Sequence, residues 1–183
     1  MNVLWSYLWP ALGLGVIFGV LAGAIGFRIP RGASNDPEQA IAVPESRRKR
    51  VIAIGAGVAL SLAGTAVWHG PLGGAERFSG RVERDLHATL VYYEMTQVSA
   101  HLHEDPLTRR VLLSGAADDF QRSELKRLIE QIPGVRSASW SSDGGGLPLI
   151  AEGCAVSLAG FLLGLLLAYL VELRRRYNAQ WNW

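Results

Sequence analysis

The sequence predicts a membrane protein with three transmembrane α-helices and one small extracytoplasmic α+β domain. Hydrophobic residues make up 49% of the 183 residues and charged residues only 19%, whereas soluble domains carry about 25% charged residues. The apolar residues are also concentrated, because residues 1–27, 51–75 and 153–171 contain no charged side chain. Each run is close to the ~20 residues that a helix needs to cross a bilayer, which excludes a purely soluble protein.

The distribution of charge predicts the orientation of these spans. Residues 28–50 contain six basic and three acidic residues (+3), and residues 172–183 contain three basic and one acidic residue (+2). Residues 69–147 contain nine basic and eleven acidic residues (−2). Basic residues near the ends of spans are retained in the cytoplasm. We therefore expect the N-terminus outside, residues 69–147 outside, the C-terminus inside and no nucleic-acid partner.

The first predicted span covers residues 4–27. Gly15, Gly19 and Gly23 recur in it at a spacing of four, which places a glycine stripe on one helix face and lets another helix approach closely in lipid. A cleaved signal peptide is the alternative for this segment, but no basic residue precedes its apolar run, and signal peptides begin with one. We therefore expect the segment to stay in the membrane.

Small residues recur at the same spacing in the other two predicted spans. They either pack the three helices on one another or dock one helix onto another membrane subunit. These residues are Gly55, Ala59 and Ala63 in the span of residues 51–68, and Gly160 and Gly164 in the span of residues 148–171.

The segments between and after these spans are expected in the cytoplasm. Residues 28–50 contain three prolines and no sustained period, which predicts an irregular basic linker. The tail, residues 172–183, carries Tyr177, Trp181 and Trp183, which suit either interfacial anchoring or a partner contact. A basic cluster ends the linker and either marks the topology alone or also binds anionic lipid head groups; it consists of Arg47, Arg48, Lys49 and Arg50.

The exterior domain is expected in residues 76–142 and begins with a helix. Its apolar stripe recurs at intervals of four, four, four and three, as one face of an amphipathic helix does. Residues 98–103 then alternate between apolar and polar side chains, which predicts a half-buried strand. A turn at residues 104–107 and a second strand at residues 110–116 complete a hairpin. The stripe consists of Phe78, Val82, Leu86, Leu90 and Tyr93.

A second helix and a third strand follow. Asp118 or Asp119 caps the helix, and Gln121 stands at the third helical position from Asp118, as in a capping box. Pro133 and Gly134 end the helix, and residues 135–140 alternate as a short strand. The predicted apolar face consists of Phe120, Leu125, Leu128, Ile129 and Ile132.

This order of elements resembles the BON family of bacterial envelope domains. The resemblance rests on residues 111–135, VLLSGAADDFQRSELKRLIEQIPGV, in which Leu113 and Gly115 match the end of the family's strand and Gly134 and Val135 open its last strand. It implies two helices on one face of a three-stranded sheet, in a non-catalytic module that binds phospholipid surfaces or other envelope components. Together with the predicted orientation, it implies a bacterial inner-membrane protein whose exterior domain lies in the periplasm. BON modules often occur in tandem or on soluble or lipid-anchored chains, whereas this chain has one copy between two spans.

The sequence contains no phosphate loop, nucleophile elbow or thiol pair, so we expect neither an enzyme nor a cofactor. His101 and His103 point from one strand face, but two ligands are fewer than a closed zinc site needs, so His87 or a carboxylate would have to supply the rest. A solvated strand face is the default interpretation. Glu152 near the outer end of the third span has three interpretations: an interfacial residue, a polar contact between helices, or a group that handles ions.

Three functional hypotheses remain. The first is an inner-membrane protein that presents the BON-like domain to an envelope partner or to anionic phospholipid. The second is an accessory subunit of a larger membrane complex, docked through its glycine stripes. The third is a metal-binding or ion-handling membrane protein. Under the first hypothesis, the basic residues expected to be exposed and to contact lipid or a partner are Arg109, Arg110, Arg122 and Arg136.

Overall fold

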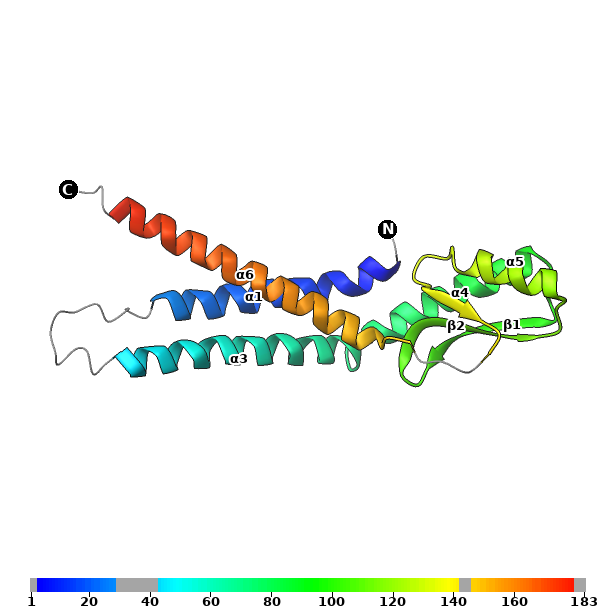
Figure 1. Cartoon of the computed structure of the whole chain (residues 1–183), viewed down its shortest axis with the longest axis horizontal. Coiled ribbons are helices and arrows are strands. Elements are labelled where there is room, and N and C mark those ends of the chain that lie inside the picture. The colour runs from blue at the N-terminus through cyan, green and yellow to red at the C-terminus, as the bar shows by residue number, and fades with distance from the viewer. Residues whose placement is uncertain (1–2, 29–42, 142–145, 180–183) are drawn as a thin grey trace. The chain divides into compact units, whose positions relative to one another are not determined.

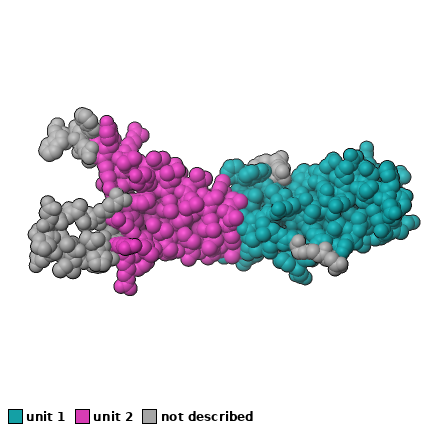
Figure 2. Space-filling model, viewed as in Figure 1, with its two compact units in different colours: residues 1–9, 67–153 teal, residues 10–66, 154–183 magenta. Residues whose placement is uncertain are grey.

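The computed structural model of the protein describes residues 3–28, 43–141 and 146–179. These residues form five helices and three strands (Figure 1), with the residues grouped into two compact units (Figure 2): residues 1–9 with 67–153, and residues 10–66 with 154–183. The elements in chain order are α1 (Val3–Arg28), α3 (Val43–His69), α4 (Gly74–Tyr92), β1 (Val98–Glu104), β2 (Leu107–Gly115), α5 (Asp119–Ile129), β3 (Ser137–Ser139) and α6 (Leu149–Ala179).

Three of the described helices, α1, α3 and α6, are long and apolar enough to cross a membrane, as the sequence predicts. Helix α3 begins at Val43, earlier than the predicted boundary at residue 51, so Arg47 and its basic neighbours lie in its first turns and not in an irregular linker. The rest of the predicted linker, residues 29–42, lies outside the described residues, as do Trp181 and Trp183.

Glycines bring α1 and α6 together within the second unit. A Cβ atom on Gly15 would collide with the carbonyl oxygen of Ser157, and one on Gly19 would collide with that of Phe161. On α6, a Cβ atom on Gly164 would collide with the carbonyl oxygen of Val16. Gly160 and Gly23 lie at the same contact, against Leu12 and Ala168. The two stripes therefore pack on each other, backbone to backbone, which only glycine permits at this separation.

Helix α3 joins this pair through buried hydroxyl groups. Ser61 Oγ lies 2.6 Å from Ser157 Oγ of α6, and the Thr65 hydroxyl donates to the Ser61 carbonyl at 3.0 Å. All three side chains are fully buried. The opposite face of α3 is exposed, including Ala59 and Ala63, so the small-residue stripe of this helix is not used in the contact.

The α4 helix packs on the sheet through the predicted stripe. Phe78, Val82, Leu86 and Leu90 are buried. Tyr93 is not part of the stripe, because the helix ends at Tyr92 and the Tyr93 side chain is 44% exposed. The apolar period therefore identified the buried face correctly but extended it one residue too far.

The sheet has the strand order β1-β2-β3, with β1 antiparallel to β2 and β3 parallel to β2. The predicted hairpin is therefore confirmed. Ala100 pairs with Leu113 and Leu102 pairs with Val111, and all four side chains are buried. Since alternate residues of a strand face the same side, one face of the sheet forms the core, against which α4 packs at β1 and α5 packs at β3.

The cap of α5 is the predicted capping box. The Gln121 amide donates to Asp118 Oδ1 at 2.7 Å, and the Asp118 amide donates to Gln121 Oε1 at 3.1 Å. Leu125 and Ile129 are buried as predicted. Phe120 is not in the core as predicted, because it stands in the first turn with its side chain 75% exposed.

Two glycines close the domain at positions that other residues tolerate poorly. Gly115 has a φ of 126°, and a Cβ atom there would collide with the Gln97 carbonyl oxygen. Gly134 has a φ of 107°, and a Cβ atom there would lie 3.0 Å from Val82. The chain has already left α5 at Ile129, so Gly134 forms the turn that leads into β3 and not the end of the helix itself.

Candidate functional site

The start of α6 is bound to the α+β domain through Glu152. Its Oε2 atom lies 3.2 Å from Arg109 Nη1 of β2, and its Oε1 atom lies 3.7 Å from Arg136 Nη1 ahead of β3. The Glu152 and Arg109 side chains are only 14% and 19% exposed. Among the alternatives left open by the sequence, none anticipated that Glu152 would pair with arginines of the folded domain.

Arg109 also braces the domain internally. Its Nε atom donates to the Gly134 carbonyl at 3.0 Å, and its own carbonyl accepts from the Arg136 amide at 2.7 Å. A half-buried arginine with this many acceptors holds three chain segments in one place. The prediction that Arg109 is an exposed residue is therefore wrong.

Of the other three arginines that the sequence predicts to contact lipid or a partner, one is buried and two are exposed. Arg110 is also buried, against the prediction, and donates to Ser139 Oγ at 2.7 Å. Arg122 is exposed and lies 5.3 Å from the ring centre of Trp140, and Arg136 is 63% exposed. The four arginines therefore do not form one exposed basic surface.

The ends of α1 and α3 that belong to the first unit are joined around Tyr7. The Tyr7 hydroxyl lies 2.7 Å from His69 Nδ1, and Trp68 Nε1 donates to the Tyr7 carbonyl at 3.0 Å. The Tyr7 ring is 2% exposed and its centre lies 6.1 Å from that of Phe78 in α4. We call the end of the domain that contains Tyr7, Trp68, Arg109 and Glu152 the anchored end. Sequence reasoning did not identify Tyr7, because both of its polar partners lie about sixty residues away.

The opposite end of the domain carries exposed aromatic residues. Helix α4 ends and α5 begins at the end of the sheet where strand β1 starts and strand β2 finishes (Figure 1). Four large apolar side chains are exposed there, and we call them the aromatic tip: Tyr92 at 80%, Phe120 at 75%, Val91 at 60% and Tyr93 at 44%. The adjacent Tyr92 and Tyr93 cannot both continue the apolar stripe of α4, and this was the signal in the sequence for an exposed aromatic side chain.

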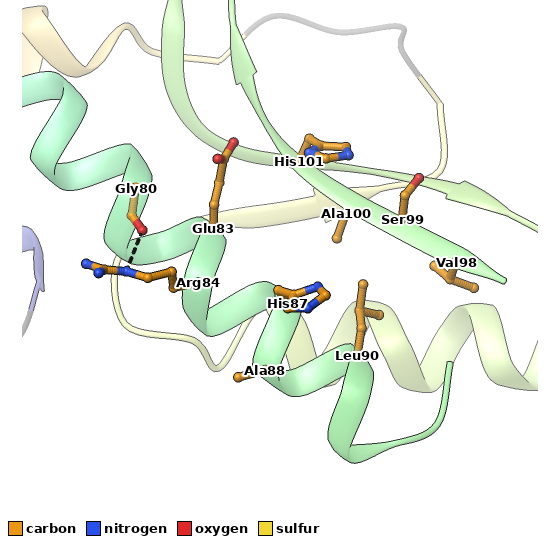
Figure 3. Close-up of a pocket in the computed structure, with 10 residues that line it drawn as sticks. All are labelled: Gly80, Glu83, Arg84, His87, Ala88, Leu90, Val98, Ser99, Ala100 and His101. Atoms are coloured by element: carbon orange, nitrogen blue, oxygen red, sulfur yellow. Dashed lines mark hydrogen bonds between the residues drawn. The ribbon is translucent and has the colours of Figure 1, made fainter. Parts of the chain in front are cut away.

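A groove lies along the domain between α4 and β1, an edge strand of the sheet. It has a volume of about 490 Å³. Figure 3 shows Glu83 and His87 of α4 and His101 of β1 around it, while Arg84 turns back to the Gly80 carbonyl, to which its Nε atom donates at 3.0 Å. His87 and His101 both line the groove, one from each of the two elements that border it.

The side chains of His101 and His103 lie in different environments. His101 is exposed in the groove, whereas His103 Nδ1 donates to the Pro106 carbonyl at 3.1 Å in the turn after β1. Within residues 3–28, 43–141 and 146–179, no group of three or more histidine, cysteine or acidic side chains is arranged to hold a metal ion. The two histidines therefore remain an incomplete ligand set.

Comparison with known proteins gives no match for this chain: no family model matches it, and no curated protein or solved structure matches it either. The BON resemblance accordingly stays a prediction that rests on residues 111–135.

Proposed function

We propose that the chain is a non-catalytic protein of the bacterial inner membrane that presents its α+β domain in the periplasm to a protein partner of the cell envelope. One observation carries the proposal: the domain is joined to the long helices at its anchored end and exposes Tyr92, Phe120 and their neighbours at its aromatic tip. A domain that is joined to the long helices at one end can present the exposed side chains of its other end to a partner.

The membrane orientation is supported by the placement of charge along the three long helices. The anchored end takes the N-terminal residues of α1, the C-terminal residues of α3 and the first residues of α6. The basic clusters stand at the other ends of the same helices, at Arg28, at residues 47–50 and at residues 174–176. Because basic residues beside spans remain in the cytoplasm, the domain belongs outside.

The aromatic tip has the composition of a protein contact. Tyrosine and phenylalanine bury large areas when a partner covers them, and tyrosine is among the residues that contribute most binding energy. Several large apolar side chains left exposed at one end of a domain favour an interaction site there. The order α4, β1, β2, α5, β3 is also the order of elements that the resemblance to BON modules implies, and such modules bind envelope components.

Photo-crosslinking in native membranes tests this proposal. A photoreactive amino acid replaces Tyr92 at the tip or, as a matched control, the exposed Asp85 on the middle of α4. We expect one discrete protein adduct from Tyr92 and none from Asp85. Equal labelling from both positions, or only lipid adducts from Tyr92, contradicts a protein contact at the tip.

A tip substitution separates binding from folding. Phe120→Ser removes an exposed side chain, so the free energy of unfolding should change by less than about 0.5 kcal/mol. The Tyr92 adduct should nevertheless weaken several-fold if Phe120 is part of the same contact. An unchanged adduct in this variant places Phe120 outside the contact and reduces the proposed surface to the tyrosines.

A second candidate function is an accessory subunit of a membrane complex, and the exposed face of α3 favours it. The stripes of α1 and α6 are occupied by each other, but Gly55 has no atom within 4 Å of a Cβ built on it, and Ala59 and Ala63 are exposed. Ala59→Leu should then lower co-purification with a membrane subunit, while Ala159→Leu on the exposed side of α6 should not. Identical co-purification of both variants counts against docking through α3.

A further inference from the structure

A second groove lies between α1 and α6, near the C-terminal ends of both helices. It has a volume of about 160 Å³ and is lined mainly by apolar residues, among them Ala24, Phe27 and Leu167. Two of its lining residues, Gly23 and Ala168, are small and lie close together, since a Cβ atom on Gly23 would lie only 2.5 Å from Ala168 Cβ. A groove of this size accommodates part of one acyl chain but not a folded protein segment.

One end of this groove is basic. Arg28 and Arg175 line it together with Glu172. Glu172 already accepts from Arg176 Nε at 2.9 Å, whereas Arg175 Nη1 lies 4.0 Å away and its side chain is 69% exposed. Among the lining residues, Arg28 and Arg175 carry two positive charges against the one negative charge of Glu172, so the groove end has a net charge of +1.

We propose that this groove binds one anionic phospholipid, with an acyl chain beside Ala24 and Leu167 and the phosphate between Arg28 and Arg175. The proposal rests on the membrane insertion proposed above but not on the aromatic tip. A ligand that fits must be apolar along most of its length and negative at one end, and an anionic phospholipid with its head at the helix ends has that polarity. Arginine is suited to the phosphate because its guanidinium group donates two parallel hydrogen bonds.

The groove differs from the other basic cluster of the chain. Residues 47–50, near the start of α3, carry four positive charges. Such clusters attract any anionic lipid surface. None of these four residues lines the groove. Arg47 and Arg48 therefore provide a matched control, since removing their charge changes the total charge of the chain by the same amount.

Native mass spectrometry of the full chain in mild detergent tests the proposal, with added phosphatidylglycerol or phosphatidylcholine of identical acyl chains. We expect one phosphatidylglycerol per chain to be retained in preference to phosphatidylcholine. Arg28→Gln with Arg175→Gln should lower this retention roughly thirtyfold, because each basic residue near a lipid head group contributes about 1 kcal/mol. Arg47→Gln with Arg48→Gln should change it by less than about twofold.

A substitution that leaves the charge unchanged tests the apolar part of the groove. Ala24→Leu fills the space beside Phe27 and should also lower phosphatidylglycerol retention several-fold, whereas Ala159→Leu on the exposed face of α6 should not. The proposal is overturned if both charge pairs lower retention equally, if Ala24→Leu has no effect, or if phosphatidylcholine is retained equally. Failure of membrane insertion is recognised separately, because an alkaline carbonate wash then releases the unaltered chain from native membranes.

Discussion

Glu152 Oε2 lies 3.2 Å from Arg109 Nη1, so the first turn of α6 and the start of β2 share a half-buried ion pair. The two residues are separated by 43 positions, and the pair joins the folded domain to the helix that leaves it. Charged groups at this depth are stable only while each has its partner, because the remaining charge would otherwise lie in a poorly solvated place. The anchored end therefore depends on both residues.

Glu152→Gln should destabilise the α+β domain by about 1–2 kcal/mol, because Arg109 keeps its charge and loses its counter-ion. Pulse proteolysis of the full chain in detergent across a urea series measures this change. Glu124→Gln is the control, since the Glu124 pair with Arg127 is exposed, at 40% and 69%, and should contribute less than about 0.5 kcal/mol. Equal effects of the two substitutions would show that the Arg109 pair has no special role.

Gly115→Ala should destabilise the domain by about 2 kcal/mol or more. The backbone φ of 126° is rare for residues with a side chain, and the added methyl group would collide with the Gln97 carbonyl oxygen. Gly80→Ala is the matched control, because nothing lies within 4 Å of a Cβ atom there, and alanine should stabilise the helix by about 0.5–1 kcal/mol. The same urea series compares the two, and a neutral Gly115→Ala would contradict the described turn.

Gly19→Ala should weaken the contact between α1 and α6, because the methyl group would collide with the Phe161 carbonyl oxygen and force the helices apart. Overpacking of this kind costs about 1–3 kcal/mol, which thermal unfolding in mild detergent, followed by circular dichroism, should register as a lower midpoint. Gly13→Ala has nothing within 4 Å and should leave the midpoint unchanged or raise it. A higher midpoint for Gly19→Ala is incompatible with the described contact.

The hydrogen bond between Ser61 and Ser157 should couple α3 to α6. A double-mutant cycle with Ser61→Ala and Ser157→Ala isolates this interaction from the effect of each substitution alone. We expect a coupling energy of about 0.5–1.5 kcal/mol, the usual range for hydrogen bonds between membrane helices. Additive effects of the two substitutions would indicate that the 2.6 Å contact contributes nothing.

Local patterns predicted most of the elements. The apolar stripe of α4 from Phe78 to Leu90, the hairpin and the Asp118 capping box each depend on residues a few positions apart, so short-range periodicity and turn chemistry suffice. The limits of the elements were less accurate. Tyr93 and Phe120 continue the apolar repeats in sequence, but each stands at a helix end, where the chain no longer keeps the side chain on the buried face.

Long-range pairing was not predictable in the same way. Nothing in the sequence near Arg109 indicates that it faces Glu152, and its neighbour Arg110 is buried although both residues read as solvent-facing. The same holds for Tyr7 and His69. Contacts of this kind depend on how whole helices and strands pack, and the spacing of residues in a single sequence does not reveal that packing.

Cysteine labelling in spheroplasts tests the central claim most directly, which is that the aromatic tip lies outside a membrane crossed by the three long helices. The chain has one cysteine, Cys154, so Cys154→Ser gives a background in which Tyr92→Cys or Tyr177→Cys is the single thiol. A membrane-impermeant maleimide should label Tyr92→Cys in intact spheroplasts and Tyr177→Cys only after lysis. Labelling of Tyr177→Cys before lysis, or protection of Tyr92→Cys until lysis, would contradict this account.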